Sequence, residues 1–166
     1  YLYPYYKKSI DDGMDKEFIK EILKCFWMHC NTAYDAMIRS GNQGITAGFG
    51  QLITLSGMGE KGEDKTNDLT YLILEVIDEM SPILEPKPNI RLHRKSPEKL
   101  LDRCIDMISS SQGAPFLLNF DERSMAGMMH EAKKGKVTHL IHENNVYDYA
   151  PVGCLENTMV GNDRSG

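Results

Sequence analysis

Apolar residues recur every three or four positions in three long stretches of the chain, a spacing that predicts amphipathic helices. The first helix is expected to follow Asp15, an N-cap residue, and to run to about Ser40, where a Gly-Asn-Gln-Gly segment ends it. Its predicted core face comprises Ile19, Ile22, Leu23, Phe26, Cys30, Ala33 and Met37, widened by Trp27. We interpret this aromatic stripe as part of a core rather than a cofactor site.

The next two helices are predicted by the same spacing together with capping residues. One follows Thr66 or Asn67, and its core face comprises Leu69, Leu72, Ile73, Val76, Ile77 and Met80. The other has Ser96 as its N-cap and Pro97 at the first helical position, and Gly113 ends it. Its expected buried stripe comprises Leu100, Leu101, Cys104, Ile105 and Ile108. A further helix is expected over residues 123–134.

Three short β-type segments alternate with these helices. Residues 51–55 lie between glycine clusters, residues 89–94 follow prolines that forbid helix, and residues 115–120 form a nearly continuous apolar run. Such a run is typical of a strand buried on both faces of a parallel sheet. The alternation of helices and strands predicts an α/β fold with a mainly parallel sheet. The first eight residues, rich in tyrosine, are expected to be an extended entry segment.

Composition narrows the function classes. The chain is 41% hydrophobic and 26% charged, with a formal net charge of -5. This mild acidity, without a Lys/Arg cluster to offset it, argues against a nucleic-acid partner. No apolar run approaches the roughly 20 residues that a membrane-spanning helix needs, so no membrane association is expected. Cys25 and Cys30 lie five apart on a predicted helix, which fits neither a disulfide nor a zinc site, and Cys30 and Cys104 are expected core residues. Such cysteine usage favours a reducing cytoplasm.

Two further patterns point to binding sites that we reject. Residues 45–59 are glycine-rich, but they contain neither Gly-Lys-Ser/Thr nor a dinucleotide fingerprint, so phosphate binding is disfavoured. His139 and His142 are three apart, but no acid or thiol stands at ligand spacing beside them. The sequence therefore predicts no metal site.

The most specialised stretch is residues 145–166, in which a thiol and a carboxyl stand two residues apart. In an extended or turning backbone, positions i and i+2 point the same way. Cys154 and Glu156 can therefore face one pocket while Leu155 turns into its wall. Gly153 allows a close approach or a sharp bend just before the thiol. The pattern alone leaves open the alternative of a structural cysteine beside a surface glutamate.

The run Asp148-Tyr149-Ala150-Pro151-Val152-Gly153-Cys154-Leu155-Glu156 resembles the cysteine loop of glycyl radical enzymes, the group that includes pyruvate formate-lyase. Residues 1–6, 52–57 with 67–72, and 88–93 resemble further segments of the same family, in the same order. The resemblance therefore covers nearly the whole chain. Ser56 departs from it, since many relatives carry a second glycine there.

The resemblance implies a ten-stranded α/β barrel built of two half-sheets, with the cysteine loop threaded through its centre. Residues 1–166 would then be an internal part of a single barrel domain, incomplete at both ends. The strands predicted here agree with that expectation, because two or three strands can neither close a barrel nor hide their own edges.

The resemblance also implies the chemistry of the two site residues. Cys154 would carry a thiyl radical that attacks the substrate, and Glu156 would act as acid and base. The radical would come from a glycyl radical near the C-terminus, outside these residues, which a separate activating enzyme with S-adenosylmethionine and a 4Fe–4S cluster installs. A thiol suits hydrogen-atom transfer, and a carboxyl supplies the proton movement that a thiyl radical cannot.

Within the family, the wording of the cysteine loop separates several reactions. A single cysteine after Val152-Gly153 departs from pyruvate formate-lyase, which uses two adjacent cysteines, and disfavours acyl transfer from pyruvate. Residues 153–166 are similar to the decarboxylase branch, a carbon–carbon lyase that converts 4-hydroxyphenylacetate to p-cresol. A dehydratase or C–N lyase of the diol, hydroxyproline or choline type is the alternative. The residues that hold the substrate stay unidentified, because they are expected beyond Gly166.

The expected partners follow from the same resemblance. They are a small aryl acetate substrate, the radical activating enzyme, a small iron–sulfur subunit and further copies of the chain. A hypothesis of another class is a non-catalytic α/β module that binds a partner through its glycine-rich loop. It predicts a deeply buried Cys154 and a Glu156 that points into solvent.

Overall fold

The computed structural model describes residues 1–39, 52–81, 86–110, 116–152 and 156–161. The chain divides into two compact units. We call the first the helical unit; it comprises Tyr1–Gln51, Asn67–Lys87 and Lys99–Phe116. We call the second the sheet unit; it comprises Leu52–Thr66, Pro88–Glu98 and Leu117–Gly166. Helices and strands alternate along the chain, so the predicted α/β class is confirmed.

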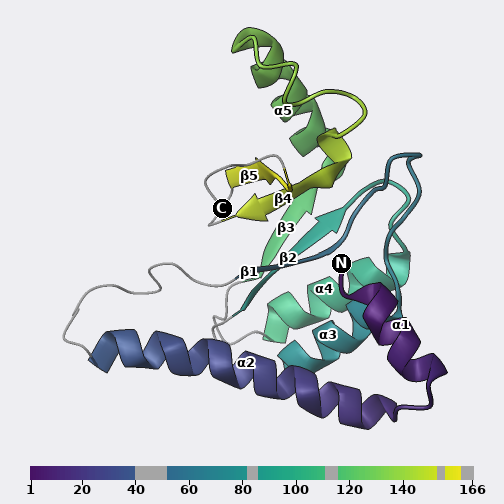
Figure 1. Ribbon diagram of the computed structural model, residues 1–166, viewed down its shortest axis with the longest axis vertical. Coiled ribbons are helices and arrows are strands. Elements are labelled where there is room, and N and C mark those ends of the chain that lie inside the picture. The colour runs from purple at the N-terminus through teal and green to yellow at the C-terminus, as the bar shows by residue number, and fades with distance from the viewer. Residues whose placement is uncertain (40–51, 82–85, 111–115, 153–155, 162–166) are drawn as a thin grey trace. The chain divides into compact units, whose positions relative to one another are not determined.

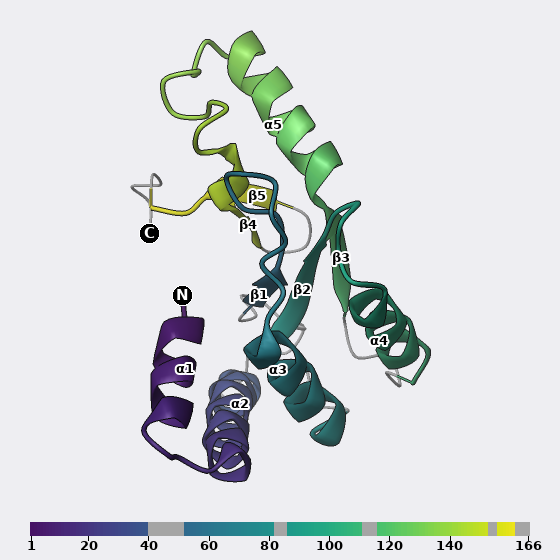
Figure 2. The same cartoon turned by 90° about the vertical axis from the view of Figure 1, so that its right-hand side faces the viewer.

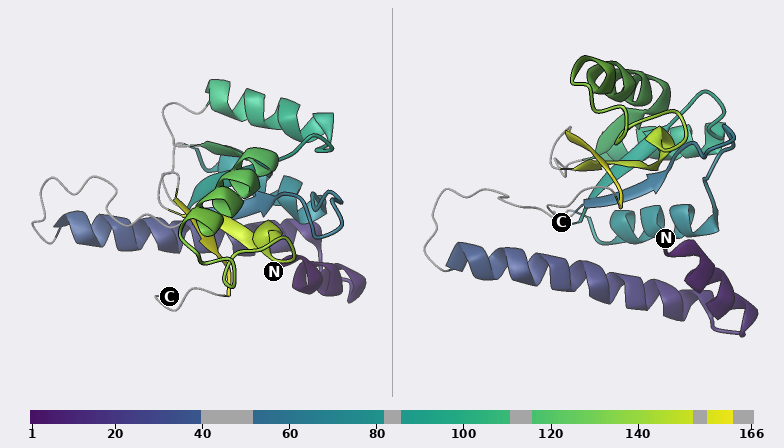
Figure 3. Two further views of the ribbon diagram at one scale, coloured as in Figure 1. Left: turned by 90° about the horizontal axis from the view of Figure 1, so that it is seen from above. Right: turned by 45° about the horizontal axis from the view of Figure 1, so that its top comes forward.

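The helical unit contains α1 (Tyr3–Asp11), α2 (Lys16–Arg39), α3 (Asp68–Glu79) and α4 (Glu98–Ser110), as Figure 1 shows. α2 lies alongside α3 (Figures 2 and 3). α3 begins with a reciprocal capping box, since Asn67 accepts from the Thr70 N–H at 3.2 Å and Thr70 accepts from the Asn67 N–H at 3.3 Å. The predicted N-cap at residue 66 or 67 is therefore confirmed. None of the described helices is long and apolar enough to cross a membrane.

The N-terminal segment differs from the prediction. Residues 1–8 were expected to be extended, whereas Tyr3–Asp11 form helix α1. Pro4 is compatible with this helix because it falls in the first turn, where a backbone N–H has no intrahelical acceptor. Ion pairs between Lys7 and Asp11 and between Lys8 and Asp12 then join side chains one turn apart.

Two helices bury a different face from the one that their apolar spacing suggested. In α4, Leu100, Cys104 and Met107 are buried. Leu101, Ile105 and Ile108 of the predicted stripe are exposed instead, Ile105 by 55%. In α2, Ile19, Trp27 and Cys30 are buried, but Ile22 and Phe26 are exposed. Both helices carry two adjacent apolar stripes about 100° apart, and the pattern cannot tell which one meets the core.

The sheet unit contains a three-stranded sheet in the order β1 (Leu52–Ser56), β2 (Lys87–Leu92) and β3 (Leu117–Phe120). β2 and β3 are parallel, with Asn89 opposite Leu117 and Leu92 opposite Phe120. α5 (Asp121–Lys134) begins directly after β3 (Figures 1 and 2). A short 3-10 helix, η1 (Val146–Asp148), then leads into β4 (Tyr149–Val152) and β5 (Glu156–Met159), which form an antiparallel hairpin.

The predicted strands are confirmed with shifted bounds. β1 and β2 lie within two residues of the expected segments, and the parallel pairing is as predicted. β3 is not buried on both faces, because Leu117 and Leu118 are half-buried and Phe120 is exposed. The helix expected at residue 123 begins at Asp121, so this acid belongs to the first helical turn. The predicted end of α4 at Gly113 lies outside the described residues.

Candidate active site

The cysteine loop lies on the hairpin β4–β5. The two strands pair from Tyr149 opposite Met159 to Val152 opposite Glu156. Residues 153–155, which include Cys154, connect the paired ends and lie outside the described residues. Glu156 is the first residue of β5, and its side chain is exposed in this chain. The non-catalytic alternative predicted an exposed Glu156 together with a buried Cys154, so the described residues meet one half of that description.

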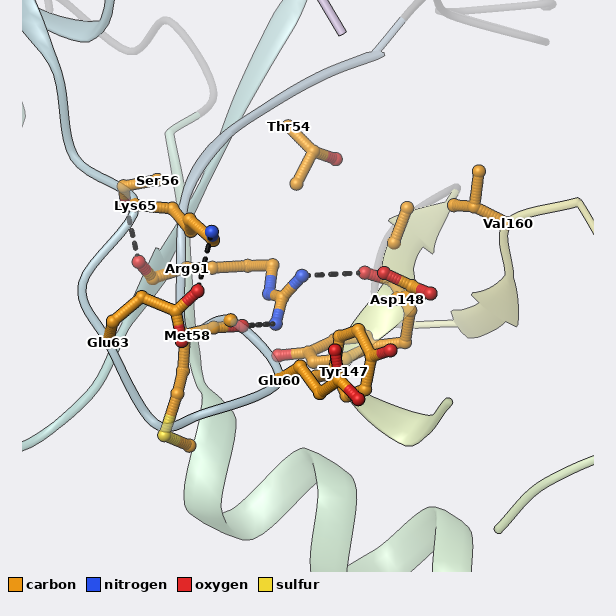
Figure 4. A pocket seen from close by; sticks show the side chains of 13 residues that line it. Thr54, Ser56, Met58, Glu60, Glu63, Lys65, Arg91, Tyr147, Asp148 and Val160 are labelled. Atoms are coloured by element: carbon orange, nitrogen blue, oxygen red, sulfur yellow. Dashed lines mark hydrogen bonds and ion pairs between the residues drawn. The ribbon is translucent and has the colours of Figure 1, made fainter. Parts of the chain in front are cut away.

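The start of the hairpin is held by Arg91, which projects from β2. Its guanidinium donates from Nη1 to the carbonyl oxygen of Tyr149 at 2.9 Å and from Nη2 to the carbonyl oxygen of Met58 at 3.4 Å. Figure 4 shows it between the Ser56–Met58 turn and the Tyr147–Asp148 segment. Arg91 is only 7% exposed, so its charge requires a partner inside the protein.

That partner is Asp121, the first residue of α5, which is fully buried. Arg91 donates to it through Nε at 2.8 Å and through Nη2 at 3.1 Å, a bidentate pair. The same carboxylate accepts from the Met58 N–H at 2.6 Å and from the Tyr149 hydroxyl at 2.7 Å. Four donated hydrogen bonds thus satisfy one carboxylate, as a buried charge needs.

Tyr149 is held at three points. Arg91 binds its carbonyl oxygen, Asp121 accepts from its hydroxyl, and the Arg91 Cζ atom lies 4.1 Å from the centre of its ring. The residue is 1% exposed, and this burial raises the pKa of its hydroxyl to about 12. The first residue of β4 is therefore fixed through both its backbone and its side chain.

Gly57 provides the space that this cluster needs. Its backbone has φ +110°, a conformation that side-chain-bearing residues rarely adopt. A Cβ atom there would lie 2.9 Å from the Cζ and Nε atoms of Arg91. The glycine thus allows the turn after β1 to pass directly over the guanidinium. The neighbouring Ser56 hydroxyl donates to the Arg91 carbonyl oxygen, which ties the same turn to β2.

Two further polar contacts complete this face of the sheet. His93 Nε2 lies 3.0 Å from Asp64 Oδ1, and its Nδ1 accepts from the Lys95 N–H, which assigns the proton to Nε2. Asn119 on β3 donates to Asn89 on β2 at 3.2 Å. Asn89, Arg91 and His93 therefore form a buried polar row, whereas Ile90 and Leu92 alternate with them on the other face.

A cavity of about 630 Å³ opens beside this cluster (Figure 4). Its lining mixes backbone with charged side chains of both signs: Thr54, Ser56, Met58, Gly59, Glu60, Glu63, Lys65, Arg91, Tyr147, Asp148, Tyr149, Ala150 and Val160. The hydrogen bond from Lys65 lowers the pKa of Glu63 to about 2, so this acid stays ionised at neutral pH. Among the described residues, no group of three or more His, Cys, Asp or Glu side chains is placed to hold a metal.

Sequence reasoning named Cys154 and Glu156 but missed the residues that hold their hairpin. Asp121 was noted only as an acid after a strand, and Arg91 only as part of a strand. A usable signal was present, because Asn89, Arg91 and His93 alternate with apolar residues in a segment that precedes a helix. Such alternation usually indicates a solvated face, whereas here the polar face is buried.

Known proteins are similar to this chain along nearly its whole length. Residues 1–165 match the family described as Pyruvate formate lyase-like. The isethionate sulfite-lyase of Oleidesulfovibrio alaskensis is 31% identical, over 98% of this chain and 19% of its own length. The (2S)-3-sulfopropanediol dehydratase of Klebsiella oxytoca is 29% identical, over 98% of this chain and 19% of its own. The chain therefore spans about a fifth of the length of these relatives.

The fold matches as well. The crystal structure of a glycyl radical enzyme from Archaeoglobus fulgidus aligns with a TM-score of 0.73 and 31% identity, over 97% of this chain and 20% of that one. The α/β piece described here thus corresponds to a fifth of such a structure, while closure of a barrel stays a prediction. The chain belongs to the pyruvate formate lyase-like family of glycyl radical enzymes.

Proposed function

We propose that the protein containing this chain is a glycyl radical lyase that eliminates a leaving group from a small hydroxylated substrate. The thiol and carboxyl of Cys154 and Glu156, at the connection of the hairpin β4–β5, carry the proposal. A glycyl radical, installed by a radical S-adenosylmethionine activating enzyme, would supply the unpaired electron. The donor set fits that role, since a thiol gives and takes hydrogen atoms and a carboxyl moves protons.

In the proposed reaction, the Cys154 thiyl radical removes a hydrogen atom from the carbon that bears the hydroxyl group. The Glu156 carboxylate accepts the hydroxyl proton, and the leaving group departs from the adjacent carbon with its bonding electron pair. The resulting product radical takes the hydrogen atom back from the Cys154 thiol. Each turn leaves the thiyl radical restored, and the proton on Glu156 leaves with the product or the leaving group.

The reported relatives support elimination over the decarboxylation that residues 153–166 had suggested. One is named as a sulfite-lyase and another as a dehydratase, and both names describe loss of a group from a hydroxylated substrate. Decarboxylation of 4-hydroxyphenylacetate remains the second candidate, on the wording of the loop alone. For the whole protein, the proposal also includes a ten-stranded barrel, an iron–sulfur subunit, an oligomer of the chain and a cytoplasmic location.

An anaerobic product assay tests this proposal. The activated full-length protein is offered isethionate, 3-sulfopropanediol, glycerol, propane-1,2-diol, trans-4-hydroxy-L-proline, choline and 4-hydroxyphenylacetate in parallel. We expect sulfite or a dehydrated product from at least one hydroxylated compound. Release of p-cresol alone would instead establish the decarboxylase, whereas trimethylamine alone would identify choline as the substrate of the proposed elimination.

Two variants test the assigned roles. Cys154→Ala should leave the glycyl radical visible by electron paramagnetic resonance while turnover disappears, because the thiol that contacts substrate is absent. Glu156→Gln keeps the size of the side chain but cannot accept a proton, so turnover should fall by at least 100-fold, as expected for loss of a general base. Full turnover by Cys154→Ala would show that the thiol is structural and would overturn the role assigned to it.

A further inference from the structure

We propose that Arg91, Asp121 and Tyr149 position the cysteine hairpin for hydrogen-atom transfer. The inference rests on the proposed function, because it assigns these residues to the alignment of Cys154. They are positioning residues, since their contacts are with the hairpin and its neighbours.

The cluster holds the hairpin at Tyr149, the first residue of β4. Arg91 binds the carbonyl oxygen of Tyr149 at 2.9 Å, and Asp121 accepts from its hydroxyl at 2.7 Å. A residue held only by its side chain can still pivot about its backbone. Tyr149 is held at both ends, and all three residues are less than 10% exposed, so water cannot replace these bonds readily.

Strand geometry determines how a movement of Tyr149 is transmitted along β4. Tyr149 lies three residues before Val152, the last residue of β4, a span of about 10 Å in extended chain at about 3.3 Å per residue. Pairing of β4 with β5 makes the hairpin move as one piece, because Val152 and Glu156 are directly opposite each other. A small rotation at Tyr149 is therefore multiplied at Val152 and Glu156, the two residues that flank the Cys154 connection. Displacement of a reacting group by about 1 Å can reduce a rate by roughly 100-fold.

The cluster joins four separate segments of the sheet unit. Arg91 comes from β2, Asp121 from the start of α5, Tyr149 from β4, and Met58 from the turn after β1. Met58 contributes both its N–H, to Asp121, and its carbonyl oxygen, to Arg91. These contacts fix the start of the hairpin relative to β1, β2 and the end of β3. A fixed position of the thiol requires such an arrangement.

The test measures hydrogen-atom exchange in the absence of substrate. In D2O the Cys154 thiol carries deuterium, and each exchange with the glycyl position replaces its α-hydrogen. The splitting that this hydrogen gives the electron paramagnetic resonance signal then disappears, at a rate that reports the alignment of the thiol. Four activated full-length variants are compared with the unaltered protein: Tyr149→Phe, Arg91→Lys, Cys154→Ala and the control Lys20→Met.

We expect Arg91→Lys to slow both the exchange and kcat by about 100-fold with little change in KM, because lysine cannot bind Asp121 and the Tyr149 carbonyl together. Tyr149→Phe keeps the ring and the backbone bond and should slow both by about 10-fold. If Arg91→Lys does not fold, Tyr149→Phe alone tests the positioning role. Lys20→Met, which alters an ion-pair cluster in the helical unit, is the control and should leave the exchange rate unchanged.

The outcomes separate this inference from the proposed function. If the unaltered protein shows no exchange, or Cys154→Ala still exchanges, the proposed function fails. If exchange depends on Cys154 but Tyr149→Phe and any folded Arg91→Lys protein exchange at the unaltered rate, the positioning role is overturned. A variant that loses turnover while its exchange stays normal also overturns it.

Discussion

The two units each contain a cluster of charges around a buried cation, and the clusters differ in the burial of their carboxylates. In the helical unit, Lys20 lies 3.0 Å from three carboxylates, those of Glu17 on its own helix and of Glu75 and Glu79 on α3. The carboxylates are 38–66% exposed. In the sheet unit, Arg91 pairs with a single carboxylate, Asp121, which is fully buried.

The difference shows which cluster depends on its geometry. Exposed carboxylates keep their hydration, so the Lys20 cluster tolerates the loss of one partner and contributes little to stability. The buried pair loses its hydration and is tolerated only with all of its hydrogen bonds in place. A fully bonded buried pair defines the position of every atom that it contacts. This rigidity suits the segment that leads to Cys154, whereas the Lys20 cluster only joins α2 to α3.

The largest effect is expected from Asp121→Asn. It removes the charge that pairs with Arg91 and turns an amide toward donors from Met58 and Tyr149, so an uncompensated buried charge remains. We expect a loss of about 3–5 kcal/mol in unfolding free energy, measured by denaturant titration of the full-length protein. Glu75→Gln in the Lys20 cluster is the matched control, and an equal loss in both variants would contradict the comparison.

Gly57→Ala should have the next largest effect. The positive φ alone costs about 1–3 kcal/mol for a residue with a side chain, and the new Cβ displaces Arg91. Gly127 in α5 is the control, because a Cβ there meets nothing within 4 Å. Gly127→Ala should stabilise by about 0.5–1 kcal/mol, since alanine is the better helix former. Thermal melts of both variants check the opposite signs.

Alkaline pH should weaken the buried cluster through ionisation of Tyr149. Burial raises the Tyr149 pKa from 10.0 to about 12, so the folded protein holds this proton more tightly than the unfolded chain. The resulting stability is present below pH 10 and is lost as the pH rises toward 12, by roughly 3 kcal/mol in total. Tyrosinate absorbance compared with Tyr149→Phe measures it. A Tyr149 that ionises near pH 10 would contradict the buried arrangement.

The smallest effect is expected from Lys20→Met. Hydrogen bonds to Glu17, Glu79 and Glu75 raise the Lys20 pKa, so its contribution is present below about pH 10.5 and is lost only at still higher pH. At neutral pH the melting temperature of the variant should be close to that of the unaltered protein. Molar salt should reduce the difference between the two melting temperatures further, because it screens the exposed carboxylates. A large decrease in melting temperature that does not depend on salt would show that the Lys20 cluster contributes to stability as the buried Arg91–Asp121 pair does.

Local signals predicted much of the fold and supplied the candidate site residues. Asn67 capped a helix as predicted, and Pro97 preceded one, because capping and proline effects involve only neighbouring residues. The thiol–carboxyl spacing of Cys154 and Glu156 was likewise visible, as was the family that it resembles. Helix α1 was not predicted, because Pro4 is compatible with both an extended segment and a first helical turn.

The sequence by itself determined where most of the helices and the three strands of the sheet lie, and which thiol and carboxyl form the candidate pair. Only the tertiary structure decided which apolar stripe of α4 is buried and that Arg91, Asp121 and Tyr149 meet. These three residues come from segments that lie 28 to 58 positions apart. Local spacing carries no information on such pairs, because their contact depends on strand order, on register and on a glycine at position 57 that leaves room for a guanidinium.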